Sequence, residues 1–225
     1  MNNHIYSISD FDNPIDFSTG SGFQLVSVPK QAKWSFITRN VDIDDVSHIA
    51  TLANRSPEPG DLIMASVTKI SQHTKLQLRT GRRSQLYPDD QVIVAFGNRY
   101  APDQFEAIVP SSLEDCHLVA AGGIAAKALS KHSNLKWPTS LKPEGFCIGH
   151  NGKPINLNQY ALEVPPACTA SNEVVNSTNN AIDHSPVIAV LGTSMNSGKT
   201  TTAAALVKGF SNAGLSVAAI KVTGT

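Results

Sequence analysis

A short stretch near the end of the chain, GTSMNSGKTTT from Gly192 to Thr202, has the residue types that bind phosphate groups. Glycine lets the main chain approach a bulky anion, lysine supplies positive charge, and threonine supplies a hydroxyl for a metal ion. The apolar run PVIAVLG precedes the stretch and an amphipathic segment follows it. We therefore expect a buried strand, a loop, and a helix whose N–H groups point at a bound phosphate.

The spacing from Thr193 to Thr200 is that of a Walker A motif, with Thr193 in the place of the first glycine. On this interpretation, Gly198 lets the main chain approach the phosphates. Lys199 reaches the β and γ phosphates and is the candidate catalytic residue, and the hydroxyl of Thr200 ligates Mg²⁺. The residues predicted to bind the cofactor are Thr193, Ser194, Asn196, Ser197, Gly198, Lys199, Thr200, Thr201 and Lys221.

Two of these candidates have a second interpretation. Thr201 fits a contact with the α phosphate or plain helix packing. Lys221, near the end of the apolar run SVAAIKV, fits a solvated strand end, or, as a resemblance to P-loop NTPases implies, a contact with a phosphate or anionic substrate.

The segment from Val187 to Thr225 resembles the start of the P-loop NTPases that include dethiobiotin synthetase and its relatives. The matched positions are Gly192, Thr193, Gly198, Lys199 and Thr200. Strand, loop, helix and strand make one βαβ unit, which predicts the beginning of a doubly wound parallel sheet. The dimerising subgroup of these proteins has an additional lysine where Ser194 stands here. A lysine donated across a dimer is therefore not expected, although a homodimer is left open.

No apolar strand ending in Asp, the usual Walker B element, follows the loop before Thr225. The acid behind the metal and the water-positioning residue would lie beyond that point. We therefore expect the sequence to be part of a longer protein, and the 225 residues alone to be inactive.

A composition shift divides the chain into three parts. Residues 1–163 are expected to form a β-rich domain, residues 164–185 a flexible linker rich in Pro, Ser, Thr and Asn, and residues 186–225 the truncated beginning of a P-loop domain. The fold class predicted is thus α/β plus a small β-barrel or sandwich with short helices. The strands are expected at 61–70, 73–79, 83–87, 91–97 and 105–110, and the helices at 42–52 and 124–131.

Weaker signals lie in the first domain. The segment 96–107, with Arg99 and Tyr100, fits a ligand loop or a turn held by an arginine–carboxylate pair. The arginines of RTGRR, from Arg79 to Arg83, fit a solvated hairpin tip. Cys116 with His117, and Cys147 with His150, are plausible metal ligands by type, but their spacing does not favour a metal site.

Charge and cysteine usage limit the partners. The chain has 18 basic and 18 acidic side chains, so bulk charge favours neither nucleic acid nor a membrane surface as partner. No apolar run approaches the length of a membrane span, and the three scattered cysteines suit a reducing cytoplasm.

The function expected is ATP-dependent catalysis of kinase or ligase type on a small molecule. ATP and Mg²⁺ would be the cofactors, and the β-rich domain would recognise substrate or form a lid. The alternative is a nucleotide-gated switch or assembly NTPase whose β-rich domain binds a protein partner.

Overall fold

The computed structural model describes residues 26–52, 55–161, 186–193 and 197–221, and its contacts divide the chain after Tyr160 into two units. The strands of the first unit are β1 (Lys33–Trp34), β2 (Val46–Ala50), β3 (Leu62–Lys69), β4 (Lys75–Gln77), β5 (Arg83–Gln85), β6 (Gln91–Phe96), β7 (Arg99–Tyr100), β8 (Phe105–Ile108), β9 (Cys116–Ala120), β10 (Ile124–Lys131) and β11 (Thr139–Gly149). Its 3₁₀ helices are η2 (Phe36–Thr38), η3 (Ile43–Asp45) and η4 (Leu157–Tyr160), and the second unit contains the helix α1 (Lys199–Asn212).

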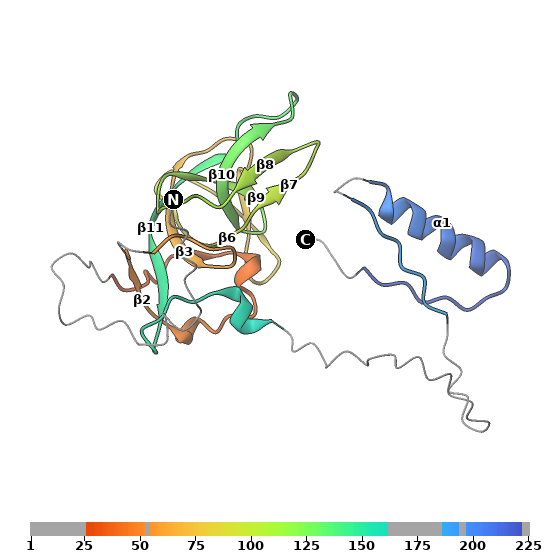
Figure 1. The fold of residues 1–225 in the computed structure, drawn as a ribbon, viewed down its shortest axis with the longest axis horizontal. Helices are drawn as coiled ribbons and strands as arrows, with labels where there is room; N and C mark the ends of the chain where they lie inside the picture. The colour runs from red at the N-terminus through yellow and green to blue at the C-terminus, as the bar shows by residue number, and fades with distance from the viewer. Residues whose placement is uncertain (1–25, 53–54, 162–185, 194–196, 222–225) are drawn as a thin grey trace, which may run out of the picture. The chain divides into compact units, whose positions relative to one another are not determined.

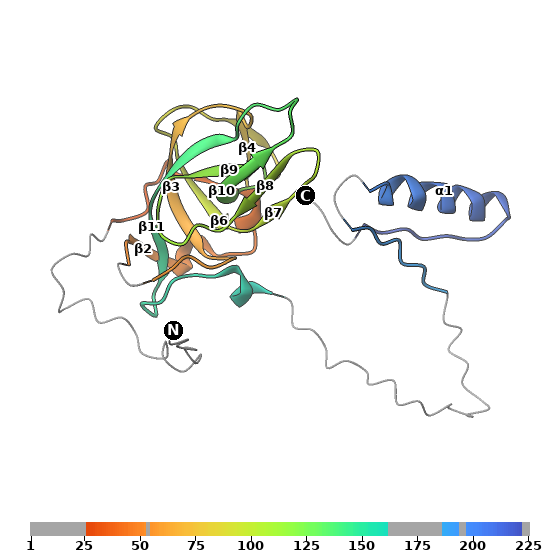
Figure 2. The same cartoon turned by 45° about the horizontal axis from the view of Figure 1, so that its top comes forward.

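Five strands of the first unit close into a ring. β6 pairs with β3, β3 with β11, β11 with β9, β9 with β10, and β10 returns to β6. Every pairing in the ring is antiparallel except the last, in which β10 runs parallel to β6 with Ile124 opposite Ala95. Figures 1 and 2 show these strands curving around a shared interior.

The other strands extend this ring. β1 adds a short parallel pairing to β6, and β2 pairs with the later part of β11. β8 pairs with β10, and β7 pairs with β8, so these strands form an arm that extends from the ring (Figure 1). β4 and β5 form a separate hairpin.

Strands β3 and β6 are buried on both faces because the sheet has a core on each side. Ile63, Val67 and Val94 belong to the cluster inside the ring, whereas Met64 and Ile93 belong to a second cluster. Apolar residues of the segments before β3 and after β11 pack against this second cluster. The strands predicted at 61–70 and 91–97 are confirmed, but the alternation in 61–70 indicated a largely apolar face on only one side of that strand.

The predicted helix at 42–52 is wrong. Asp42 accepts a hydrogen bond from the N–H of Asp44 at 3.1 Å, which caps the single turn η3. The chain then continues as β2, in which Ile49 lies opposite Cys147 of β11. The acidic first turn was therefore a real capping signal, but pairing with a neighbouring strand ended the helix after one turn.

The predicted helix at 124–131 is also wrong. These residues form β10, which pairs with three strands at once. Gly123 has φ of 106° and donates its N–H to the carbonyl of Ala120 at 3.0 Å, so the glycine pair makes a hairpin turn instead of a helix start. The alanine-rich sequence favours a helix locally, and tertiary pairing overrides that preference.

The predicted α/β fold class is wrong, because the structure is mostly β-sheet and α1 is the one α-helix in the described ranges. Residues 186–192 and 216–222 were expected to be buried parallel strands, yet their described residues, 186–192 and 216–221, pair with no strand. Val187, Leu191 and Ile220 are 93%, 87% and 87% exposed, and α1 buries no residue. A parallel strand needs neighbours on both sides to bury such apolar runs, and the described chain supplies none, so no doubly wound sheet is present.

Residues 164–185, the predicted linker, lie outside the described residues. Over the ranges that are described, no helix has both the length and the apolar character needed to cross a membrane.

Candidate functional site

Gly192 lies against the residues that precede α1. A Cβ added at Gly192 would lie 2.1 Å from the Oγ of Ser197 and 2.9 Å from the Cγ of Lys199. The two ends of the loop, Gly192 and Ser197, therefore lie side by side. Glycine at position 192 leaves room for the side chains of Ser197 and Lys199 in their observed positions.

Gly198 connects this loop to the helix. It is the N-cap of α1 with φ of 83° and ψ of 2°, a left-handed conformation that glycine adopts without strain. A Cβ added there would meet no atom within 4 Å. The backbone angle, and not the available space, is thus what requires glycine at this position.

The start of α1 presents backbone donors that the helix itself does not use. The first bond within the helix runs from the N–H of Thr202 to the carbonyl of Gly198, at 2.9 Å. The N–H groups of Lys199, Thr200 and Thr201 precede it, so they have no acceptor within the helix, and no side chain caps this end. Together with the helix dipole, these donors favour a bound anion.

The charge around the loop has one sign. The Nζ of Lys199 donates to the Oγ of Ser197 at 3.1 Å, which holds the ammonium group beside the loop. The side chains of Thr200 and Thr201 are exposed. From position 184 to the end, the sequence contains no Asp or Glu and three lysines, Lys199, Lys208 and Lys221.

The structure brings together only part of the predicted site. Gly192 and the residues from Ser197 to Thr201 form one cluster, with Thr193 in an exposed bend beside it. Ser194 and Asn196 lie outside the described residues. Lys221 is exposed in an extended segment, and no described contact joins it to the loop, so its role as a phosphate ligand stays a prediction.

Thr200 suits a Mg²⁺ ion whose other ligands come mainly from water and from the phosphates of a bound nucleotide. Its hydroxyl is exposed on the first turn of α1, and the described residues contain no group of three or more His, Cys, Asp or Glu side chains that could hold a metal by themselves. Mg²⁺ is commonly held by one or two protein oxygens, several waters and the phosphates of a nucleotide. One hydroxyl beside a phosphate cradle is consistent with that arrangement.

The segment 96–107 forms a hairpin. Arg99 donates from Nη2 to the Oε1 of Gln104 at 2.6 Å, across the turn between β7 and β8. Burial lowers the pKa of Arg99, and the charge of Asp103 opposes that shift. The contacts agree with a turn held by Arg99, which donates a hydrogen bond to the amide of Gln104 and interacts electrostatically with the carboxylate of Asp103.

A hollow of about 390 Å³ lies beside this hairpin. One of its walls, the end of β10, was not predicted from the sequence. Tyr100 and Glu106 come from the hairpin, whereas Ser130 and His132 come from the end of β10 and the residues after it. Ser130 donates to the Oε2 of Glu106 at 3.1 Å. Because 124–131 was expected to be a helix, nothing in the sequence placed Ser130 opposite Glu106.

The two described cysteines, Cys116 and Cys147, are poor candidates for reaction or metal binding. Burial raises the pKa of the Cys116 thiol to about 12, and burial also raises the pKa of Cys147. Successive residues of β9 point to opposite faces, so Cys116 is buried while His117 accepts a hydrogen bond from the Nε1 of Trp137 at 2.9 Å. The two thiols are therefore protonated core side chains at neutral pH.

Comparison of the chain with protein-family models, with curated proteins and with solved structures finds no significant match. The functional assignment therefore depends on the residues and geometry of the loop.

Proposed function

We propose that the loop from Gly192 to Thr200 binds the phosphates of ATP together with Mg²⁺. The observation that carries this proposal is the closed loop at Gly192 and Ser197, which leads directly into an uncapped helix start. Amide donors, a lysine and a hydroxyl converge there, and no acidic side chain occurs between position 184 and Thr225. Each of these features favours a polyanionic ligand.

Each group of the loop would contact a different part of Mg-ATP. The N–H groups at the start of α1 would hold phosphate oxygens, and Lys199 would neutralise charge on the β and γ phosphates. The hydroxyl of Thr200 would hold Mg²⁺, which supplies further charge neutralisation when bound. The ammonium group of Lys199 is half-exposed and bonded to the Oγ of Ser197, so it lies beside the position proposed for the phosphates.

We further propose that the bound ATP serves a kinase- or ligase-type reaction on a small molecule. Transfer of the γ phosphate depends mostly on positioning and on neutralisation of charge, which this loop would provide. The exposed side chains of Thr200 and Thr201 leave the phosphate end of the site open to a second reactant. ADP release that depends on an added small molecule, and yields a phosphorylated or ligated product, is the corresponding assay.

Titration calorimetry with Mg-ATP tests the binding proposal directly. Lys199→Ala should weaken binding about tenfold or more, because a charge-assisted hydrogen bond contributes about 1.5–3 kcal/mol. Lys208→Ala is the matched control, since Lys208 lies on the same helix, is exposed and is two turns from the loop. Equal affinity in the Lys199→Ala and Lys208→Ala variants, or no heat with the unaltered chain, would overturn the proposal.

We propose a cytoplasmic location, where ATP is abundant. The buried free thiols Cys116 and Cys147 support it, because a reducing compartment keeps thiols unpaired.

A further inference from the structure

Positive charge is concentrated in two segments of the first unit. Residues 26–41 and 62–88 contain no Asp or Glu. Their basic residues are Lys30, Lys33, Arg39, Lys69, Lys75, Arg79, Arg82 and Arg83. The neutral total of the chain therefore conceals a local excess of positive charge, which the argument from bulk charge could not detect.

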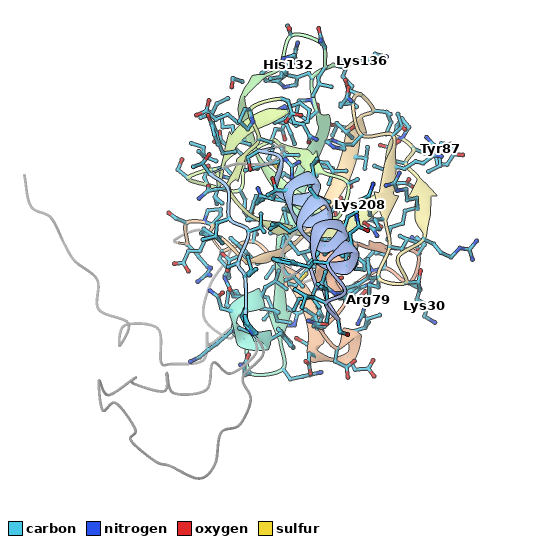
Figure 3. All side chains as sticks on the ribbon, turned by 90° about the vertical axis from the view of Figure 1, so that its right-hand side faces the viewer. Lys30, Arg79, Tyr87, His132, Lys136 and Lys208 are labelled. Atoms are coloured by element: carbon cyan, nitrogen blue, oxygen red, sulfur yellow. The ribbon has the colours of Figure 1, made fainter. Side chains whose placement is uncertain are left out.

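The fold places these two segments side by side. Ser35 forms a β-bridge with Leu78, and the N–H of Arg79 is donated to the carbonyl of Trp34 at 3.2 Å. The Nζ of Lys33 reaches the carbonyl of Gln85 at 2.9 Å. We call the surface formed by residues 30–39 and 75–87 the basic face. Figure 3 shows Lys30, Arg79 and Tyr87 on one side of the first unit.

Three cations of the basic face have no acidic partner. Lys75, Arg82 and Arg83 are exposed on the β4–β5 hairpin, and no described carboxylate forms an ion pair with any of them. Arg79 has a different role, because its Nη2 is bonded to the carbonyl of Val41 at 2.6 Å. Three charged groups are thus available to phosphates, on a hairpin whose tip is fixed by Gly81 with φ of 82°.

Aromatic rings lie beside other cations of the basic face. Tyr87 is 61% exposed, and the Nζ of Lys33, which forms an ion pair with Asp90, lies 5.6 Å from its ring centroid. Arg79 lies over Trp34 at 5.7 Å, and Arg39 lies over Phe36 at 4.5 Å. An exposed ring beside cations provides a stacking surface for a base next to charge for its phosphate.

We propose that the basic face binds single-stranded nucleic acid. Lys75, Arg82 and Arg83 contact the phosphates, and Tyr87 stacks on an unpaired base. A duplex offers no open base face to this tyrosine, and a membrane surface offers phosphates but no flat ring. The combination of free cations with an exposed aromatic ring therefore favours a single strand.

Fluorescence anisotropy of the full chain with labelled oligothymidylate and oligouridylate tests this proposal across a salt series. Lys75→Ala/Arg82→Ala/Arg83→Ala should abolish most binding and reduce the slope of log K against log salt by about 2, at about 0.7 for each lost phosphate contact. Tyr87→Ala should weaken binding about tenfold at every salt concentration, because stacking does not depend on counterions. Tyr87→Phe keeps the ring and should bind normally.

Lys153→Ala is the control for loss of one positive charge, since Lys153 lies outside both acid-free segments. It should leave affinity and salt slope unchanged, and circular dichroism should show that all variants remain folded. Three results would overturn the proposal: no binding at low salt, full binding by the triple variant, or no effect of Tyr87→Ala. Tighter binding to duplex DNA or to anionic lipid vesicles than to single strands would overturn it as well.

Discussion

At the scale of single residues, α1 has one glycine at its N-cap, Gly198, and one in its interior, Gly209. Gly198 has a left-handed backbone, whereas Gly209 lies inside the helix, and a Cβ at either position would meet nothing within 4 Å. The two positions therefore differ in backbone conformation and not in crowding.

Gly198→Ala should weaken Mg-ATP binding and increase hydrogen exchange at the start of α1, because a left-handed alanine costs about 1–2 kcal/mol. Gly209→Ala should instead slow exchange along the helix, since alanine in a helix interior is favoured over glycine by about 0.5–1 kcal/mol. Equal effects of the two substitutions would show that the conformation of Gly198 is not needed for the site.

The buried thiol of Cys116 predicts a pH dependence of stability. Burial, assisted by the charges of Asp115 and Glu114, raises its pKa to about 12 from an ordinary value of 9.0. The unfolded thiol ionises first as pH rises, so its contribution is complete below pH 9 and is lost toward pH 12. In that window the free energy of unfolding should fall by about 1.4 kcal/mol per pH unit for this group.

Urea unfolding from pH 8 to 11 measures this slope in the wild type and in Cys116→Ala. The substitution should remove about 1.4 kcal/mol per pH unit from the slope, whatever it does to stability at neutral pH. Parallel slopes in the two proteins would mean that Cys116 ionises equally in the folded and unfolded chains.

The sequence predicted which loop residues lie together, but it did not predict which distant segments lie next to one another in the fold. Ser197, Gly198, Lys199 and Thr200 lie together at a helix start, because their spacing is a local property of the chain. The neighbours of Lys221 depend on strand pairing over a long range, which a local apolar run does not encode. The basic face was missed for the same reason, since residues 30–39 and 75–87 meet only in the folded unit.

At the scale of elements, alternating segments were predicted well and interrupted ones were not. Strand β11 contains Pro143 and Gly145, residues that usually argue against a central strand, and it went unrecognised. The register shifts between these two positions, so they lie at a bulge. A Cβ at Gly145 would lie 2.8 Å from the carbonyl oxygen of Ala50, which shows that glycine admits the close approach of β2.

Asp61, at the start of β3, should be the most costly buried charge to remove from the first unit. Its fully buried carboxylate accepts from the Nη2 of Arg55 at 2.7 Å, the N–H of Glu58 at 2.8 Å and the Nδ2 of Asn156 at 2.9 Å. Asp61→Ala should destabilise the unit by about 3–5 kcal/mol, because it removes the buried, hydrogen-bonded partner of Arg55 and leaves only the longer contact with Glu58.

Glu58→Ala is the matched control for this network. The side chain of Glu58 is 63% exposed and 3.8 Å from Arg55, so its loss should cost less than about 0.5 kcal/mol. Chemical denaturation compares the two variants. A similar decrease in the free energy of unfolding in both variants would mean that the buried carboxylate of Asp61 contributes no more to stability than the exposed carboxylate of Glu58.

At the scale of the whole molecule, the division after Tyr160 predicts independent responses of the two units. Residues 1–161 expressed alone should unfold with the same midpoint as the first unit of the full chain. Mg-ATP should protect the backbone of α1 from hydrogen exchange and leave exchange in β3, β6 and β11 unchanged. Protection that reached these strands would show that the two units are energetically coupled.

The position of β11 in the ring has a consequence for how the protein is made. β11 pairs with β3, β9 and β2, so the first unit cannot close until its last strand has been synthesised. About 80 residues separate the end of β3 from the end of β11, which takes about 4–16 s at about 5–20 residues per second. During that interval the apolar strand β3 lacks its final neighbour β11, which leaves apolar surface of the nascent chain open to aggregation.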